Sequence, residues 1–131
     1  MSDSKLYTDR LLTYWDPNLR GFTHEGYTHG ATEVSSLCGD EVEFRLVRCP
    51  DPQTFDACLE IVDVWARGCC VCECSAAMLA ELARGKSLAW LVTFYDADWL
   101  KYVNIPVSKS RKQCLMLPLH CLRKAVTTPR S

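Results

Sequence analysis

The sequence contains no run of about eighteen or more apolar residues, so it lacks the signal of a membrane-spanning helix. Its start, MSDSKLYTDR, lacks the basic and then apolar pattern of a secretory signal. We therefore expect no membrane insertion and a cytoplasmic protein. Internal repeats, low-complexity tracts and Gly/Ser linkers are also missing. With 131 residues, 48% of them hydrophobic, the chain can bury a core, which predicts one compact domain over residues 1–131.

A large excess of one charge is missing as well. The formal net charge is −1, which argues against binding to nucleic acid, because neutralising phosphates requires a basic excess. The charge is nevertheless uneven, since no Asp or Glu follows Lys101. The basic residues there either favour a helix C-terminus and solvent, or form a docking patch for an acidic partner. They are Lys101, Lys109, Arg111, Lys112, Arg123, Lys124 and Arg130.

Cysteine is abundant, with nine in the chain. In a reducing compartment, cysteines are better interpreted as metal ligands or reactive thiols than as disulfides. The stretch RGCCVCECS holds Cys69, Cys70, Cys72 and Cys74. It fits a zinc site, a redox dithiol, a metal-cluster site or small buried side chains. The Cys69-x-x-Cys72 spacing suits a redox dithiol, yet no βαβ pattern surrounds it. On a helix, Cys70 and Cys74 share a face and Cys72 points elsewhere.

Local patterns predict most of the elements. Apolar positions at helical spacing predict a helix over residues 6–15, and alternation predicts a strand over residues 41–47. An Ala- and Leu-rich stretch predicts a helix over residues 75–85 with Gly85 as its left-handed C-cap. Ser87 and Asp96 are predicted N-caps of two short helices. The segment GFTHEGYTHG, residues 21–30, reads as a Gly-punctuated loop, and ATEVSSLCGD leads from it into the strand.

Two segments are harder to assign. Residues 55–67 have helical spacing, but the β-branched stretch IVDV fits a strand, and periodicity alone favours the helix. The last helix ends near Val126. We expect it to begin at about Cys114, because Pro118 is tolerated in a first helical turn and breaks a helix interior.

Three cysteines stand where a loop meets a regular element: Cys38, Cys69 and Cys114. A helix N-terminus stabilises the negative charge of a thiolate, and such junctions leave the sulfur accessible. Three thiolates could therefore converge on one metal, with Asp40 adding an oxygen. Three sulfurs and a carboxylate make either a tetrahedral zinc site or one end of an iron-sulfur cluster with one weak ligand.

The chain resembles the iron-sulfur cluster assembly scaffold family, of the IscU, NifU N-terminal and SufU type. The resemblance is carried in order by DPNLRG, LCGDEVEFRL, GCCVCECSAAMLAELARGK and RKQCLMLPLHCLRKAV. It implies an α+β fold, a small antiparallel three-stranded sheet with helices packed on it, in which residues 58–67 are a strand. It also implies that Cys38, Asp40, Cys69 and Cys114 are the ligand set.

The resemblance implies a function too. Such scaffolds accept sulfur from a cysteine desulfurase and iron from a donor, build a [2Fe-2S] cluster and pass it to apo-proteins, and zinc often occupies the site. This is a carrier role rather than catalysis, with Cys38 as persulfide acceptor, in a monomer or weak homo-oligomer. The alternatives are a zinc-dependent sulfurtransferase of the SufU kind and a purely structural zinc clip.

Some positions depart from the family pattern. Gln113 stands where IscU-type scaffolds have a histidine before the third cysteine, so the fourth ligand depends on Asp40. The segment IPVSK is an imperfect match to the chaperone-recognition stretch, which leaves a chaperone partner open. The spacing from Cys69 to Cys114 is short and IscU-like. Cys70 and Cys72, where the family has small residues, are candidates for alternative ligands or a persulfide relay, and Cys74 for a core residue.

Overall fold

We describe the protein from a computed structural model, in which residues 26–35, 39–48, 58–104 and 108–129 are described. Three strands form one antiparallel sheet in the order β1-β2-β3: β1 (His29–Val34), β2 (Glu41–Arg48) and β3 (Leu59–Arg67). Four helices follow: α2 (Cys70–Ala83), α3 (Leu88–Val92), α4 (Asp96–Val103) and α5 (Lys109–Val126). The helix predicted over residues 6–15 lies outside the described residues.

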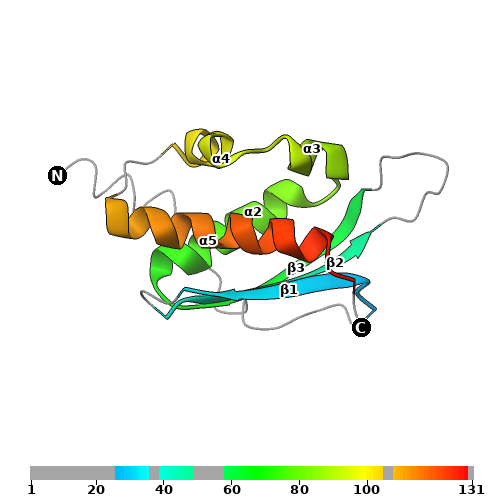
Figure 1. Cartoon of the computed structure of the whole chain (residues 1–131), viewed down its shortest axis with the longest axis horizontal. Helices are drawn as coiled ribbons and strands as arrows, with labels where there is room; N and C mark the ends of the chain where they lie inside the picture. Colours follow the sequence, from blue (N-terminus) through cyan, green and yellow to red (C-terminus); the bar gives the residue numbers. More distant parts are fainter. Residues whose placement is uncertain (1–25, 36–38, 49–57, 105–107, 130–131) are drawn as a thin grey trace.

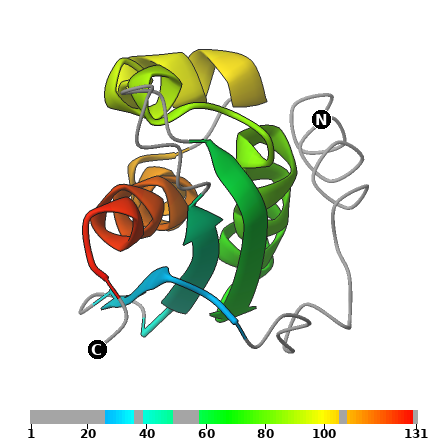
Figure 2. The ribbon, with the colours of Figure 1, turned by 90° about the vertical axis from the view of Figure 1, so that its right-hand side faces the viewer.

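The elements stack in three layers (Figure 1). Helix α2 packs on β3, and α5 packs on β1 and β2, so the two helices cover the same face of the sheet and contact each other. Helices α3 and α4 form the outer layer over them, as the turned view shows (Figure 2). Within the described part of the chain, no helix combines the length and apolar character that a membrane crossing requires.

The predicted strand over residues 41–47 is confirmed as β2. Val42, Phe44 and Leu46 are fully buried, and the residues between them are only partly covered. Since successive side chains of a strand point to opposite faces, β2 sends its apolar side chains toward α2 and α5. On the other face, Arg45 pairs with Glu43 at 2.8 Å. Burial of alternate residues thus fixes the register of the central strand.

The helix that periodicity favours over residues 55–67 is wrong for the described part of that segment. Leu59–Arg67 is strand β3, antiparallel to β2, as the family resemblance implies. The pairing has a bulge, because Val47 faces Ile61 and Arg48 faces Leu59, which leaves an extra residue in β3. The bulge shifts the alternation by one position. Leu59 and Val62 therefore both face the core, which mimics a helical spacing in the sequence.

Strand β1 is not predicted from the sequence: its first two residues fall in the segment read as loop, and no element is predicted over residues 31–34. His29–Val34 pairs with β2, with Ala31 opposite Phe44. Its side chains give little signal, since they are only partly buried or exposed and Val34 is 58% exposed. The strand forms because the edge of β2 and the surface of α5 offer it partners.

Helix α2 begins at Cys70, earlier than the predicted start at residue 75. The predicted left-handed glycine at its C-terminus is confirmed, because Gly85 has a φ of 82°, in the region that suits glycine. The C-cap itself is Arg84, one residue before Gly85. The N–H of Gly85 then donates to the carbonyl of Leu59 at 2.7 Å. This bond ties the end of α2 to the start of β3, so the helix runs back along the strand that precedes it.

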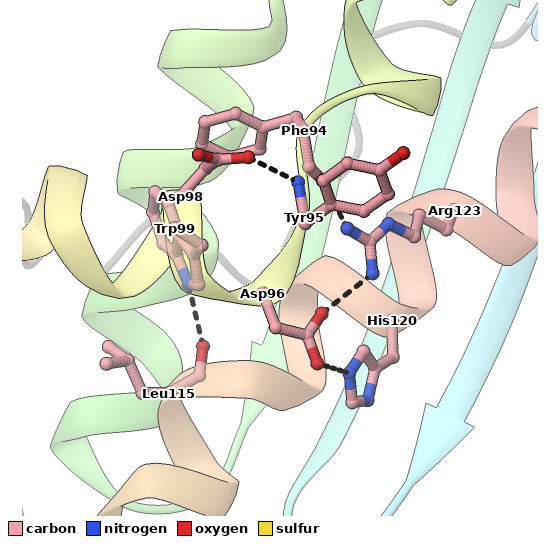
Figure 3. Close-up of polar contacts among 8 residues, drawn as sticks. All are labelled: Phe94, Tyr95, Asp96, Asp98, Trp99, Leu115, His120 and Arg123. Atoms are coloured by element: carbon pink, nitrogen blue, oxygen red, sulfur yellow. Dashed lines mark hydrogen bonds and ion pairs between the residues drawn. The ribbon is translucent and has the colours of Figure 1, made fainter.

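Of the two N-caps predicted for α3 and α4, the first is confirmed and the second is wrong. Ser87 caps α3 by accepting from the N–H of Trp90. The N-cap of α4 is Tyr95 and not Asp96, which occupies the first helical position. Asp96 is used differently, because it accepts from Arg123 at 2.8 Å and from His120 at 3.3 Å, both on α5 (Figure 3).

A buried contact completes the attachment of α4. Trp99 is fully buried, and its Nε1 donates to the carbonyl of Leu115 on α5 at 2.9 Å (Figure 3). Arg123 also donates to the carbonyl of Phe94. The outer layer is therefore fixed to α5 by one indole and by the side chains around Asp96.

Helix α5 begins at Lys109, so the predicted start at about Cys114 is wrong. Pro118 lies in the helix interior, where it has no N–H to donate to the carbonyl of Cys114. Such a position costs about 3 kcal/mol or more in an isolated helix. Packing outweighs it, because Leu115, Leu119 and the other core residues of α5 are buried against the sheet. Tertiary contacts, not local propensity, set the length of this helix.

Candidate metal centre

Asp40 leads directly into β2 and is 2% exposed. The turn before it is closed by two backbone bonds, from Ser35 to the carbonyl of Asp40 and from Gly39 to the carbonyl of Ser35. Gly39 has a φ of 74°, a conformation that suits glycine. The turn therefore holds the Asp40 carboxyl group against the protein rather than in solvent, and a buried carboxylate needs partners.

Cys69 provides those partners. Asp40 Oδ1 accepts from the backbone N–H of Cys69 at 3.0 Å, and Oδ2 accepts from its thiol at 3.3 Å. Cys69 is the N-cap of α2 and makes no side-chain cap bond of its own. Its sulfur is thus directed to Asp40, next to the positive end of the helix dipole.

Gly68 makes this close approach possible. A Cβ added at Gly68 would lie 2.1 Å from Asp40 Oδ1, a severe overlap. Its φ of 153° also disfavours any residue with a side chain. Gly68 is not among the site residues predicted from the sequence, where the signal for it is a glycine directly before a cysteine.

Cys114 comes from the opposite side, on the second turn of α5, and is 4% exposed. One ligand atom each from Asp40, Cys69 and Cys114 lie within 4.8 Å of one another. Among the residues that the structure describes, this is the one group of three or more His, Cys, Asp or Glu side chains with such spacing. Three distant parts of the chain, before β2, before α2 and on α5, therefore meet at one point.

The other predicted site residues divide into three cases. Cys38 lies outside the described residues. Cys72 is fully buried in the hydrophobic core and is not part of the group. Cys70 is exposed, and its sulfur lies 3.6 Å from that of Cys74, which is fully buried. Burial, reinforced by the hydrogen bond with Cys70, raises the pKa of Cys74 to about 12.

Two further residues, Cys121 and Gln113, lie outside the group formed by Asp40, Cys69 and Cys114. Cys121 is a core thiol that donates to the carbonyls of Ala31 and Val42, and burial raises its pKa to about 12. Gln113, which precedes Cys114, is exposed and lines a groove of about 500 Å³ with Lys112 and Met116. The groove opens beside the helix turn that carries Cys114.

Two thiols and a carboxylate at this spacing can hold one divalent ion and leave a coordination position for a further ligand. Zinc accepts this donor set in tetrahedral geometry, and iron in a cluster is held mainly by thiolates. Since the oxygen of Asp40 is a harder donor than sulfur, it would be the weakest of the three as a ligand to a soft metal. The geometry therefore suits a soft or borderline metal that can be released.

No protein-family model and no curated protein sequence matches this chain. Solved structures do. A protein from Fervidobacterium islandicum, described as an iron-sulfur cluster assembly scaffold for the SUF system, is 16% identical with a TM-score of 0.71. The match covers 94% of this chain and 98% of that one.

A second solved structure is the N-terminal part of a nitrogen-fixing NifU-like protein from Brucella abortus. It is 18% identical with a TM-score of 0.65, and the match covers 94% of this chain and 93% of that one. At such identities the likeness concerns the fold. This chain therefore has the α+β fold of SufU-type and NifU N-terminal-like proteins, as the sequence resemblance implied.

Proposed function

We propose that the protein is an iron-sulfur cluster assembly scaffold, which receives sulfur from a cysteine desulfurase and iron from a donor, builds a [2Fe-2S] cluster and passes it to apo-proteins. The observation that carries the proposal is the convergence of Asp40, Cys69 and Cys114 within 4.8 Å. The fold shared with two proteins named for scaffold or NifU-like roles supports it.

Each residue has a role in this proposal. Cys69 and Cys114 bind metal through sulfur, and Cys38 is the third sulfur ligand and the acceptor of a persulfide. Asp40 is the exchangeable ligand, because a carboxylate oxygen holds iron of a cluster less firmly than a thiolate does. Asp40 also accepts hydrogen bonds from the backbone N–H and the thiol of Cys69, which keep both residues in place.

The first turn of α5 is the proposed docking site for the sulfur donor. Lys109, Arg111 and Lys112 are exposed there, and the turn has no acidic residue. Cations at a helix N-terminus are unfavourable, since the dipole is positive at that end. Residues that break a local rule often serve binding. An acidic surface on the donor would compensate these charges and bring its persulfide to the edge of the site.

A second function is favoured by the compactness of the site. Ligand atoms within 4.8 Å of one another span a single ion more readily than a two-iron cluster. In that case the protein is a zinc-dependent sulfur carrier, in which zinc is held permanently and Cys38 takes the persulfide. The SUF-system protein has the same fold.

Anaerobic reconstitution with iron and sulfide separates the two functions. A scaffold acquires visible absorbance from a cluster, and the variants Cys69→Ser and Cys114→Ser acquire little. A zinc carrier stays colourless and accelerates a desulfurase while its zinc content remains constant. If neither a cluster nor desulfurase stimulation is observed, both proposed functions are wrong. The variant Cys72→Ala is the matched control, because it removes a buried thiol outside the site.

A further inference from the structure

A second pair of thiols lies at the start of α2. Cys70 and Cys74 are one helical turn apart, with their Sγ atoms 3.6 Å from each other. Cys70 is exposed and Cys74 is fully buried, so the pair has one sulfur at the surface and one beneath it. An ion arriving from solvent would meet Cys70 first and would be enclosed on reaching Cys74.

This pair is separate from the Asp40 site. Cys69 precedes Cys70 in the sequence, but its thiol is engaged with Asp40 at 3.3 Å. Among the described residues, no third His, Cys, Asp or Glu completes a group with Cys70 and Cys74 at ligand spacing. The helix start therefore presents sulfur to two different places, and the second place offers two ligands.

The number of ligands and the helical geometry decide which chemistry fits. Residues four apart on a helix have Cβ atoms about 5–6 Å apart. A disulfide needs a Cβ–Cβ distance of about 3.5–4.5 Å, so an S–S bond between Cys70 and Cys74 would require the helix to unwind. Zinc in structural sites takes four ligands. Cu(I) is a soft ion that selects thiolates, and it is stable with two of them.

We propose that Cys70 and Cys74 bind one Cu(I) ion as a two-coordinate thiolate site. Binding forms two Cu–S bonds, breaks the two S–H bonds and releases both protons to solvent, with no change in oxidation state. The resulting complex carries a negative charge at the N-terminal turn of α2, where the helix dipole is favourable. A thiophilic ion is thereby held apart from Cys69 and Cys114.

The test is an anaerobic titration of zinc-loaded protein with Cu(I), supplied as a complex with a chromophoric chelator, while a zinc indicator reports zinc release. The parent should take the first Cu(I) from the chelator without releasing zinc. In Cys70→Ser, which changes an exposed side chain, the first Cu(I) should displace zinc or stay with the chelator. Cys74→Ala should behave like Cys70→Ser, and Cys72→Ala, on the same helix, should match the parent.

The proposal is overturned if Cys70→Ser binds as much Cu(I) as the parent without releasing zinc, or if copper-edge X-ray absorption shows more than two sulfur ligands at the first ion. Failure of the proposed function gives a different result. A protein that holds no zinc and builds no cluster would contradict the scaffold and carrier functions. Even then, the number of Cu(I) ions bound by the parent and by Cys70→Ser still decides the copper site.

Discussion

The carboxylate of Asp40 accepts both the backbone N–H of Cys69, at 3.0 Å, and its thiol, at 3.3 Å. One short side chain thus joins the start of β2 to the start of α2. An oxygen of the same carboxylate would face a metal shared with Cys69 and Cys114. The strength of the metal site and the order of the helix start are therefore linked through Asp40.

Replacing Asp40 by Ala should prolong the life of a reconstituted cluster, because the exchangeable oxygen ligand is lost and thiolates remain. The measurement is the decay of visible absorbance in the presence of a chelator, or the rate of transfer to an apo-protein. Asp96→Asn, which alters a carboxylate between α4 and α5, is the control and should decay like the parent. Faster loss of the cluster from Asp40→Ala would show that this role of Asp40 is wrong.

Gly68→Ala should weaken both the fold and the metal site. The new Cβ overlaps Asp40 Oδ1, and the φ of 153° adds strain of about 1–3 kcal/mol. Gly85→Ala is the matched control, since its φ is 82° but nothing lies within 4 Å of an added Cβ. Both variants should be less stable in urea unfolding, and Gly68→Ala alone should lose zinc affinity. Equal zinc affinity in the two variants would contradict the proposed contact.

Replacing Lys109, Arg111 and Lys112 by Glu should weaken docking of the sulfur donor without lowering the stability of the fold. Acidic residues suit a helix N-terminus, by about 0.3–1 kcal/mol each at low ionic strength, so the thermal midpoint should stay or rise. Stimulation of a desulfurase, measured against salt concentration, should fall. Arg84→Glu, exposed at the far end of α2, should leave stimulation unchanged. A variant that stimulates like the parent would rule out this docking site.

Removing zinc with a chelator should lower stability without unfolding the protein. A ligand at 100 times its Kd adds about 2.7 kcal/mol to the free energy of unfolding, which chelation would remove. Cys114 belongs to the buried hydrophobic core, but most of that core, including Phe44, Trp99 and Leu119, consists of side chains outside the site. Far-UV circular dichroism should therefore persist while the thermal midpoint falls. Complete loss of the signal would instead favour the structural zinc clip.

Asp96→Asn should cost stability in a way that depends on pH. Burial by itself raises the pKa of Asp96, but the hydrogen bonds from Arg123 and His120 outweigh it, and the pKa falls below the ordinary 3.8. Because this pKa is lower in the folded state, the ionised Asp96 contributes to the free energy of unfolding. That contribution is complete above pH 3.8 and is lost as the pH falls through the folded-state pKa.

The side chain of Asp96 is half exposed, so solvent screening limits its contribution to the free energy of unfolding to about 0.2–1 kcal/mol near neutral pH. Urea unfolding at several pH values measures it, with Glu81→Gln as the control for loss of an exposed acid. The difference between Asp96→Asn and the parent should shrink in acid and in high salt. A difference that persists below the folded-state pKa would show that packing, rather than charge, is responsible.

Local patterns in the sequence are sufficient for β2, for the body of α2 and the left-handed glycine that follows it, and for the cap at Ser87. In these elements each residue's burial follows the period of its own strand or helix, so neighbours in the sequence carry the information. Cys69 stands at a junction between a loop and a helix, as its sequence context predicts. Cys114 does not, because α5 begins at Lys109 and the buried Cys114 lies on its second turn. Cys70 and Cys74 can be placed on one helix face because their spacing matches one helical turn.

Only the tertiary structure decided the rest. Strand β1 and the strand character of β3 depend on pairing with β2, and the bulge in β3 gave its apolar residues a helix-like spacing. The start of α5 at Lys109 and the interior position of Pro118 depend on packing against the sheet. The distance between Asp40, Cys69 and Cys114 is set by how β2, α2 and α5 stack. Spacing along a chain cannot specify that arrangement, because it arises from contacts between residues far apart in sequence.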